Sequence, residues 1–329
     1  MRAKLLGLSL VLALPILVSG AGAQETKPLG ERLYDVIVAG LPRVFPGYRA
    51  NHAKGAVFDG RFLATPEASA LSAATVFQGQ AVPLTIRYSN AGGLPDAPDN
   101  APQASVRAMA FSFLPPDGAS VDLMCINMPV FVVKTPEDFI AFNKAAQASG
   151  PGAAQPTQVA QWIGSHPETK TFVITPRPMP VSYATQDYYA IHAYKLTNAA
   201  GATQFVRFHV VPVAGRQFIT LEDAAKTAPN ALIDEMRARV AAAPAVFRLE
   251  AQLAEPGDVT NDPTVAWPES RKVVTLGTIT VTAAVSNNDE VQKKIGFLPN
   301  KSVKGFGPSD DPFLDARAAA YIVAFPKRQ

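Results

Sequence analysis

The sequence predicts an α+β fold in which about eight mostly antiparallel strands are combined with helices placed before, between and after them. Three observations lead to this prediction. Several segments alternate apolar and polar residues, short turns join neighbouring segments, and 48% of the 329 residues are hydrophobic, enough for a sizeable core. A closed barrel would remove exposed strand edges, but the same patterns also fit a two-sheet sandwich.

The first 23 residues have the features of a secretory signal peptide. Arg2 and Lys4 precede an apolar run that ends in the small-residue pattern Ala-Gly-Ala. The run is too short to span a membrane comfortably, and no other segment approaches 18 apolar residues. We therefore expect cleavage before Gln24, export to the periplasm, and a mature chain of residues 24–329 that forms one domain without an integral membrane segment.

Helices are predicted where apolar residues recur every three to four positions behind a start signal. They cover residues 33–44, 66–77, 136–146, 157–165, 232–240 and 312–324. In the last helix, Asp311 is the expected N-cap and Pro312 takes the first helical position. Strands are predicted at residues 82–89, 107–114, 121–131, 188–196, 204–211, 246–253 and 272–282. Connections rich in Gly, Pro and Asp separate them, such as the loop at residues 90–103.

Charge and cysteine content exclude several classes of function. The net charge of +3 falls to +1 once the signal peptide, with its two basic residues, is removed, which gives no electrostatic case for nucleic-acid binding. The single Cys125 rules out an internal disulfide, a CxxC redox motif and a cysteine-based zinc site. With only four histidines in the chain, we do not expect a multi-histidine metal site.

The segment from Tyr48 to Gly55 carries the first candidate chemistry, because Arg49 lies three residues before His52. A neutral imidazole can take a proton from a bound hydroxyl or hydroperoxide and return it to a neighbouring oxygen. A buried arginine beside it needs an anionic partner. Taken alone, this pattern more often marks a loop histidine beside surface charges.

Arg317 and Tyr321 form a second candidate pair, since residues four apart share one face of a helix. A tyrosine hydroxyl binds ferric iron only as the phenolate, and its unperturbed pKa is about 10. A guanidinium beside the oxygen favours that phenolate, and an axial tyrosinate is one known mode of haem ligation. Taken alone, the pair also fits a core tyrosine next to a surface arginine.

Together with two further stretches, these motifs resemble the haem catalase family, and most of all its small catalase-related peroxidases. Arg49-x-x-His52-Ala-Lys-Gly resembles the distal motif, and Arg87-Tyr-Ser resembles the family's Arg-Phe-Ser. Residues 122–131 resemble its Gly-Asn-Asn-x-Pro-x-Phe strand, and Arg317-x-x-x-Tyr resembles its proximal helix. The resemblance implies an antiparallel eight-stranded β-barrel with surrounding helices, and a single haem-binding domain that holds haem b.

The resemblance also implies roles for individual residues. His52 would be the distal acid–base residue, Ser89 would orient it, and Tyr321 would bind the iron. The cofactor would otherwise be held by Arg49, Arg87 and Arg328 at the propionates, by Phe139 stacking on the ring, and by Arg317 beside the tyrosinate. Asp311 and His192 match positions that support the proximal side.

One departure from the family pattern concerns the distal strand. Counted back from Pro129, the catalytic asparagine of catalases falls at Ile126, and Asn127 falls on the second asparagine. A shift of one residue along a strand turns a side chain to the other face. We keep Asn127 as a candidate catalytic residue, but expect weak or no catalase activity and a peroxidase that uses hydrogen peroxide or organic hydroperoxides with an unknown electron donor.

Three other functions remain compatible with the sequence. The chain could be a hydroperoxide isomerase on the same fold, which product analysis would reveal as a rearranged epoxide. It could be a haem-binding protein without turnover, or a barrel that binds an apolar ligand and no haem. The absorption spectrum of the purified protein separates the last case from the others, while the oligomeric state stays open.

Overall fold

The computed structural model describes residues 27–329, so the predicted signal peptide and its cleavage site before Gln24 lie outside the described residues. Every pairing between its strands is antiparallel. The order β7-β5-β4-β3-β2-β1-β9-β8 closes on itself through the β7–β8 pairing. The predicted eight-stranded barrel is thus confirmed, and the sandwich alternative is wrong.

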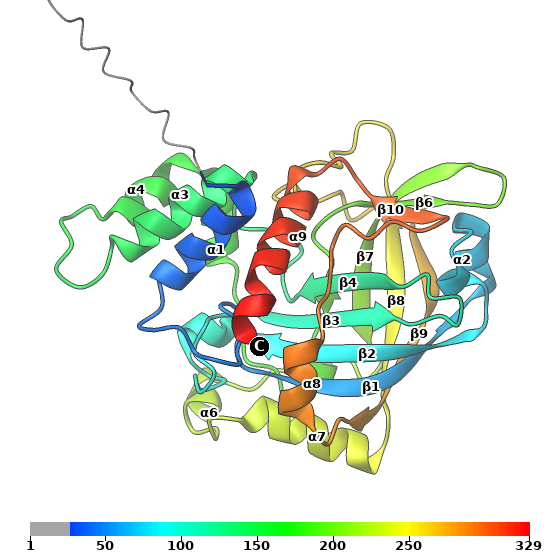
Figure 1. Ribbon diagram of the computed structural model, residues 1–329, viewed down its shortest axis with the longest axis horizontal. Coiled ribbons are helices and arrows are strands. Elements are labelled where there is room, and N and C mark those ends of the chain that lie inside the picture. The colour runs from blue at the N-terminus through cyan, green and yellow to red at the C-terminus, as the bar shows by residue number, and fades with distance from the viewer. Residues whose placement is uncertain (1–26) are drawn as a thin grey trace, which may run out of the picture.

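The strands of the barrel are β1 (Gly55–Ala64), β2 (Ala81–Asn90), β3 (Arg107–Phe113), β4 (Val121–Ile126), β5 (Tyr188–Tyr189), β7 (Thr203–Pro212), β8 (Ala245–Leu253) and β9 (Val273–Ala284). The short strands β6 (Tyr194–Thr197) and β10 (Phe306–Pro308) extend the sheet beyond β7 (Figure 1). Apolar side chains fill the barrel. Among them, Tyr88, Met109 and Cys125 are fully buried and come from three neighbouring strands.

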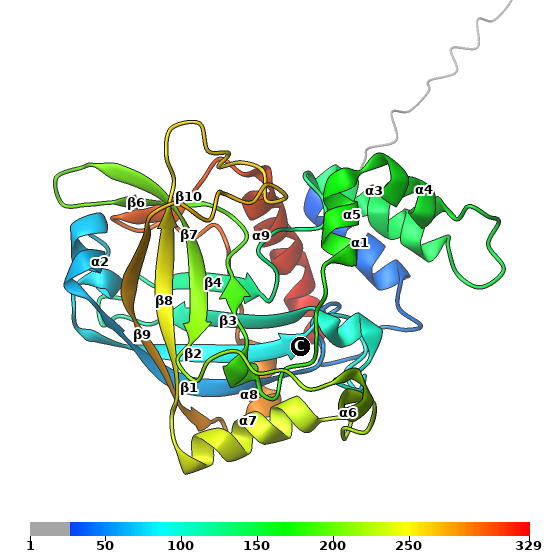
Figure 2. The same cartoon turned by 180° about the vertical axis from the view of Figure 1, so that it is seen from behind.

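Helices cover the outside of this barrel. They are α1 (Leu29–Ala39), α2 (Pro66–Leu71), α3 (Pro136–Gln147), α4 (Gln158–Ser165), α5 (Pro167–Ile174), α6 (Leu221–Ala225), α7 (Ala231–Ala242), α8 (Asn288–Lys294) and α9 (Pro312–Ala324). Figures 1 and 2 show α9 between the ends of β2–β4 and a projecting group of helices that includes α1, α3 and α4. Among residues 27–329, no helix combines the length and apolarity needed to cross a membrane.

Helix α9 begins as the sequence predicts. Asp311 is its N-cap, with a side chain that accepts the N–H of Phe313, and Pro312 is its first residue. An apolar cluster with Leu33 and Val36 fixes α9 against α1. The two helices approach closely at Gly30, where a Cβ would lie 2.8 Å from the backbone carbon of Ala319. The N-terminal helix therefore helps to position the helix that carries the second candidate motif. This N-terminal helix, α1, covers Leu29–Ala39, whereas the sequence predicted a helix over residues 33–44.

Three strand predictions need correction. β1 was missed because its alternation is interrupted by a register shift between Asp59 and Gly60; there, a Cβ on Gly60 would lie 2.7 Å from the Thr280 oxygen of β9. The strand predicted at residues 121–131 ends at Ile126. Beyond it, the chain turns away, and Phe131 donates its N–H to the carbonyl of Pro263.

The strand predicted at residues 188–196 is broken into β5 and β6. Residues 190–193 leave the regular ladder between them, and this break brings His192 under α9, where it meets Asp311 at 2.7 Å. The helix predicted at residues 66–77 is also divided, into α2 and a 3₁₀ turn at Thr75–Phe77. Helices α5, α6 and α8 were not predicted.

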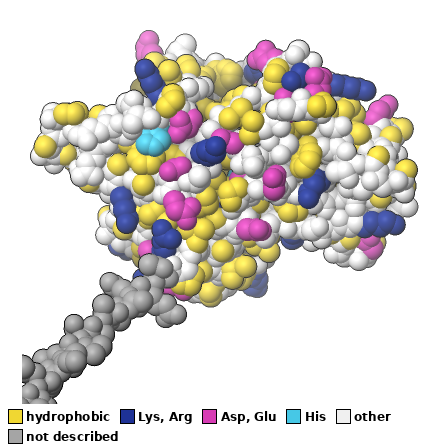
Figure 3. Space-filling view, turned by 90° about the horizontal axis from the view of Figure 1, so that it is seen from above, with side chains coloured by type: hydrophobic (Ala, Val, Ile, Leu, Met, Phe, Trp, Pro, Cys, Tyr) yellow, Lys and Arg dark blue, Asp and Glu magenta, His cyan; other side chains and the backbone are white. Residues whose placement is uncertain are grey.

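The face of the molecule seen from above carries side chains of both charges. In the view from above, acidic and basic side chains are interspersed among apolar ones, and neither sign dominates that face (Figure 3). This face therefore has no basic stripe of the kind that binds a nucleic acid.

Candidate active site

His52 lies in a tight turn just before β1. Among residues 27–329 it is the single non-glycine residue with a positive φ, at 55°, a conformation that occurs mostly where the surroundings enforce it. The side chain of Asn51 enforces it here, because its Oδ1 accepts the N–H of His52 at 2.9 Å and that of Gly92 at 2.8 Å. The turn therefore places the imidazole at a fixed position.

Ser89 is where the resemblance implies it should be. Its Oγ lies 3.1 Å from Nδ1 of His52, so a hydrogen bond between them fixes the ring and leaves Nε2 for another partner. The pKa of His52 is lowered to about 3, first by burial and then by the positive charges of Arg87, Arg317 and Arg49. The imidazole is consequently neutral near pH 7 and able to accept a proton.

The outer face of β2, β3 and β4 forms the floor of the site. Residues opposite one another in antiparallel strands point to the same side of a sheet. Ser89 is paired with Ala108, and Ala108 is paired with Ile126. Ile126 therefore shares the face of Ser89. This partly exposed isoleucine occupies the position at which the catalase pattern has its catalytic asparagine.

Asn127 lies beyond the end of β4 and its amide is engaged with the backbone. Its Oδ1 accepts the N–H of Arg107 at 3.0 Å, and its Nδ2 donates to the carbonyl of Ser105 at 3.1 Å. These bonds join the ends of β3 and β4. The structure thus shows a structural use for this amide, and its catalytic role stays a prediction.

A chain of hydrogen bonds starts at Tyr321 on α9. Arg317 donates to the Tyr321 hydroxyl from Nη2 at 2.9 Å and from Nε at 3.2 Å, and its Nη1 lies 2.7 Å from Nε2 of His192. Because the guanidinium can only donate, Nε2 accepts and Nδ1 carries the proton toward Asp311, 2.7 Å away. The predicted group of Tyr321, Arg317, His192 and Asp311 is thus one connected network.

The charges in this network are well defined. Burial, the largest single cause, lowers the pKa of Arg317, but the charge and hydrogen bond of Tyr321, together with Tyr194 and Asp311, raise it by more, and the net pKa is raised. The guanidinium therefore stays cationic. Burial also lowers the pKa of His192, so its ring is neutral. Two charge-assisted donors thus point at the Tyr321 oxygen and stabilise negative charge there, while the tyrosine itself remains 37% exposed.

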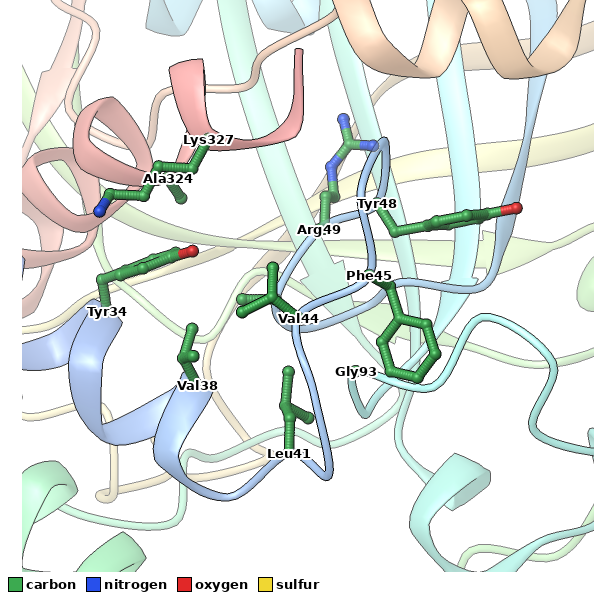
Figure 4. A pocket seen from close by; sticks show the side chains of 11 residues that line it. Tyr34, Val38, Leu41, Val44, Phe45, Tyr48, Arg49, Gly93, Ala324 and Lys327 are labelled. Carbon is green, nitrogen blue, oxygen red and sulfur yellow. The ribbon is translucent and has the colours of Figure 1, made fainter.

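Three further arginines converge on the C-terminal end of α8. Arg49 donates to the carbonyls of Gln292 at 3.2 Å and Ile295 at 3.0 Å. Arg87 donates from Nε to the Gln292 side chain at 2.8 Å, and Arg328 donates to the Ile295 carbonyl. Figure 4 shows Arg49 on the loop that follows α1, beside a small hollow. Helix α8 thus brings together Arg49 and Gln292, which are 243 positions apart in the sequence.

None of these three arginines forms an ion pair with a carboxylate of residues 27–329. Burial, with the charge of Arg328 next, lowers the pKa of Arg87 to about 9. Burial lowers the pKa of Arg328 to about 10, and its buried Nε has no hydrogen-bond partner in this part of the chain. Buried cations of this kind need an anion.

The residues present therefore fit a haem. Its two propionates would supply the missing anions, and Tyr321 would bind the iron as a phenolate supported by Arg317. Residues 27–329 contain no group of three or more His, Cys, Asp or Glu side chains arranged to hold a metal ion directly. Phe139 on α3 stacks on Phe131, with ring centroids 6.0 Å apart, and its predicted contact with the porphyrin stays a prediction.

Sequence reasoning missed Gln292 and Asn51. Gln292 holds two arginines that are more than 200 positions away in the sequence. Asn51 fixes the turn of its neighbour His52 and also binds Gly92, 41 positions away. Asn51 could have been noticed as a turn residue next to His52. No local signal pointed to Gln292.

Comparison with known proteins agrees with the geometry. The family model described as Catalase matches residues 45–328. A catalase-related peroxidase of Mycolicibacterium paratuberculosis is 38% identical over 286 residues, which cover 86% of this chain and 90% of that protein. A catalase-related peroxidase of Synechococcus elongatus is 32% identical over 328 residues, with 97% and 94% coverage.

Solved catalases share the fold. A fungal catalase superposes with a TM-score of 0.76 at 23% identity, covering 87% of this chain and 60% of that one. Catalase A from Saccharomyces cerevisiae gives 0.75 at 22% identity, with 85% and 61% coverage. The chain thus spans about three fifths of these solved catalases but nearly the full length of the two peroxidases. With the family model matched over most of its length, this chain belongs to the catalase family.

Proposed function

We propose that this chain is an exported haem b peroxidase, which reduces hydrogen peroxide or an organic hydroperoxide with electrons from a separate donor. The observation that carries the proposal is the pair of N–H groups that Arg317 directs at the Tyr321 hydroxyl, at 2.9 and 3.2 Å. A cation held in this way stabilises the phenolate, which is the form in which a tyrosine binds ferric iron. The names of the relatives at 38% and 32% identity support the same class of enzyme.

When bound, the haem iron supplies the redox chemistry of peroxide cleavage. His52 supplies the proton transfer: its neutral Nε2 accepts the proton of the peroxide O–H and returns it to the oxygen that leaves as water or alcohol. Ser89 holds Nδ1 at 3.1 Å, so the ring keeps Nε2 toward the substrate. The low pKa of His52, about 3, keeps this base unprotonated over the physiological range.

Ile126 is the reason to propose peroxidase rather than catalase activity. It shares the sheet face of Ser89 through the paired residue Ala108, and its side chain can neither donate nor accept a hydrogen bond. A second peroxide entering the site meets no amide there that could orient it. We therefore propose slow release of dioxygen and a dependence on a reducing donor.

Export is supported by the charged start, the apolar run and the Ala-Gly-Ala pattern of the first 23 residues. The mature protein should begin near Gln24 and be recovered with periplasmic contents. N-terminal sequencing checks this, and an intact Met1 in a cytosolic fraction would count against it.

The activity is tested with an organic hydroperoxide and a chromogenic donor. The proposal expects one alcohol for each hydroperoxide consumed, with stoichiometric oxidation of the donor. A rearranged epoxide formed without donor oxidation would identify an isomerase instead. If the purified protein contains haem but catalyses neither reaction, it is a haem-binding protein without this enzymatic activity.

A further inference from the structure

Arg87 is more deeply buried than Arg49, Arg317 and Arg328, the other arginines of the site. It is 3% exposed and makes three hydrogen bonds, to the Gln292 side chain at 2.8 Å and to the carbonyls of His52 at 2.8 Å and Ala53 at 3.3 Å. All three acceptors are uncharged. The same guanidinium therefore joins α8 to the turn of His52, while no acceptor neutralises its charge.

Two other basic side chains of the described residues have carboxylate partners. Lys54, two residues after His52, is paired with the fully buried Asp99 at 2.8 Å, and Arg271 is paired with Asp258 at 2.8 Å. Glutamine has almost the shape of glutamate, so a carboxylate could occupy the same position and bind Arg87 more strongly. An amide holds the guanidinium in place and leaves its positive charge available.

We propose that Gln292 is a positioning residue, which fixes Arg87 for a carboxylate of the cofactor and, by being neutral, keeps that arginine free to pair with it. The proposal rests on the haem site put forward above. It also assigns a function to α8, whose only buried residue is Gln292. The C-terminal end of α8 carries partial negative charge and receives Arg49 and Arg328 without neutralising them.

Gln292 also borders a hollow at the surface, and this limits which variants are useful. It lines a surface hollow of about 170 Å³ together with Tyr48, Lys54 and Arg237. Gln292 thus stands between this hollow and Arg87, and a small residue at this position would admit water to the arginine. Variants should keep the volume of glutamine, which glutamate and methionine both do.

The two variants separate charge from orientation. In Gln292→Glu, the new carboxylate pairs with Arg87 and competes with the cofactor. In Gln292→Met, Arg87 keeps its charge but loses a hydrogen bond that orients it. Lys294→Gln is the control, because it changes the net charge by the same amount as Gln292→Glu, two residues away on an exposed position of α8.

The first measurement is the rate of haem transfer from each purified holoprotein to an excess of an acceptor protein. A charged hydrogen bond contributes enough that Gln292→Glu should release haem about tenfold to a hundredfold faster. Gln292→Met should release it about two- to tenfold faster, since a neutral partner is lost. Lys294→Gln should behave as the unmodified protein. Equal release from Gln292→Glu and the unmodified protein would overturn the proposal.

The second measurement is the thermal midpoint of the full mature chain after its haem has been transferred. Here Gln292→Glu should raise the midpoint, because it supplies an anion to buried cations that otherwise lack one. A residue that merely packs would show the opposite sign, and a lowered midpoint would overturn the proposal. If the unmodified protein holds no haem at all, the proposed function fails, while this second measurement still shows whether Gln292 leaves the charge of Arg87 without a neutralising partner.

Discussion

The role of His52 can be tested by two substitutions that separate its side chain from its backbone. His52→Ala and His52→Gly both remove the imidazole, but only glycine tolerates the φ of 55° without strain. The glycine variant should therefore be more stable than the alanine variant by about 1 kcal/mol. If the imidazole carries the proton, both variants should slow the reaction with peroxide equally, whatever their difference in stability.

The size of the effect follows from general acid–base catalysis, which contributes about a hundredfold to ten-thousandfold. This range corresponds to about 3 to 5 kcal/mol of transition-state stabilisation. Ser89→Ala removes only the bond of 3.1 Å that orients the ring. A net hydrogen bond of about 1 kcal/mol corresponds to a loss of about fivefold. Haem content should be unchanged in all three variants, because Tyr321 is intact.

The assay is the stopped-flow change in haem absorption after mixing with peroxide, at matched haem occupancy. In the unmodified protein, the rate should be constant from about pH 8 to pH 5, since the pKa of His52 is about 3 and only the neutral ring accepts a proton. The propionates would weaken the effect of the arginines on this pKa, but burial, the largest cause, remains. A rate in His52→Gly equal to that of the unmodified protein would refute the role of His52.

Three further predictions concern the floor of the site and its support. Ile126→Asn should increase dioxygen release from hydrogen peroxide relative to donor oxidation, measured with an oxygen electrode, and an unchanged ratio would show that the missing amide does not set the balance. Lys54→Met leaves Asp99 buried without its cation and should lower the free energy of unfolding by about 3 to 5 kcal/mol, measured in urea. Gly30→Val forces a side chain into the backbone of Ala319 and should lower it by about 1 to 3 kcal/mol; an unchanged unfolding midpoint would mean that α1 does not hold α9.

Much of the fold could be predicted because its signals are local. The long alternating strands β2, β3, β7, β8 and β9 were all expected, and α9 was placed correctly by its N-cap Asp311 and by Pro312. The feature that distinguishes a barrel from a sandwich is not a local one. It depends on the pairing of β7 with both β5 and β8, which no pattern within a single strand reveals.

The elements that could not be predicted are those that are defined by contacts with residues far away in the sequence. α8 is a short polar helix with one buried residue, so it has no apolar stripe to detect. β1 changes register between Asp59 and Gly60, where the glycine lets the backbone of β9 approach closely. The pairs Arg49–His52 and Arg317–Tyr321 were found because their members are close in sequence, whereas Gln292 meets Arg87 across 205 positions. Spatial convergence of this kind needs a structure.

The ligation of haem iron by Tyr321 is the central claim, and the absorption spectrum of ferric Tyr321→Phe tests it most directly. Phenylalanine keeps the ring but removes the oxygen that receives both donors of Arg317. We expect the variant, at equal protein concentration, to lose stoichiometric haem or to lose the tyrosinate-type spectrum shown by the unmodified protein. A Tyr321→Phe protein with full haem content and an unchanged tyrosinate-type spectrum would contradict the account.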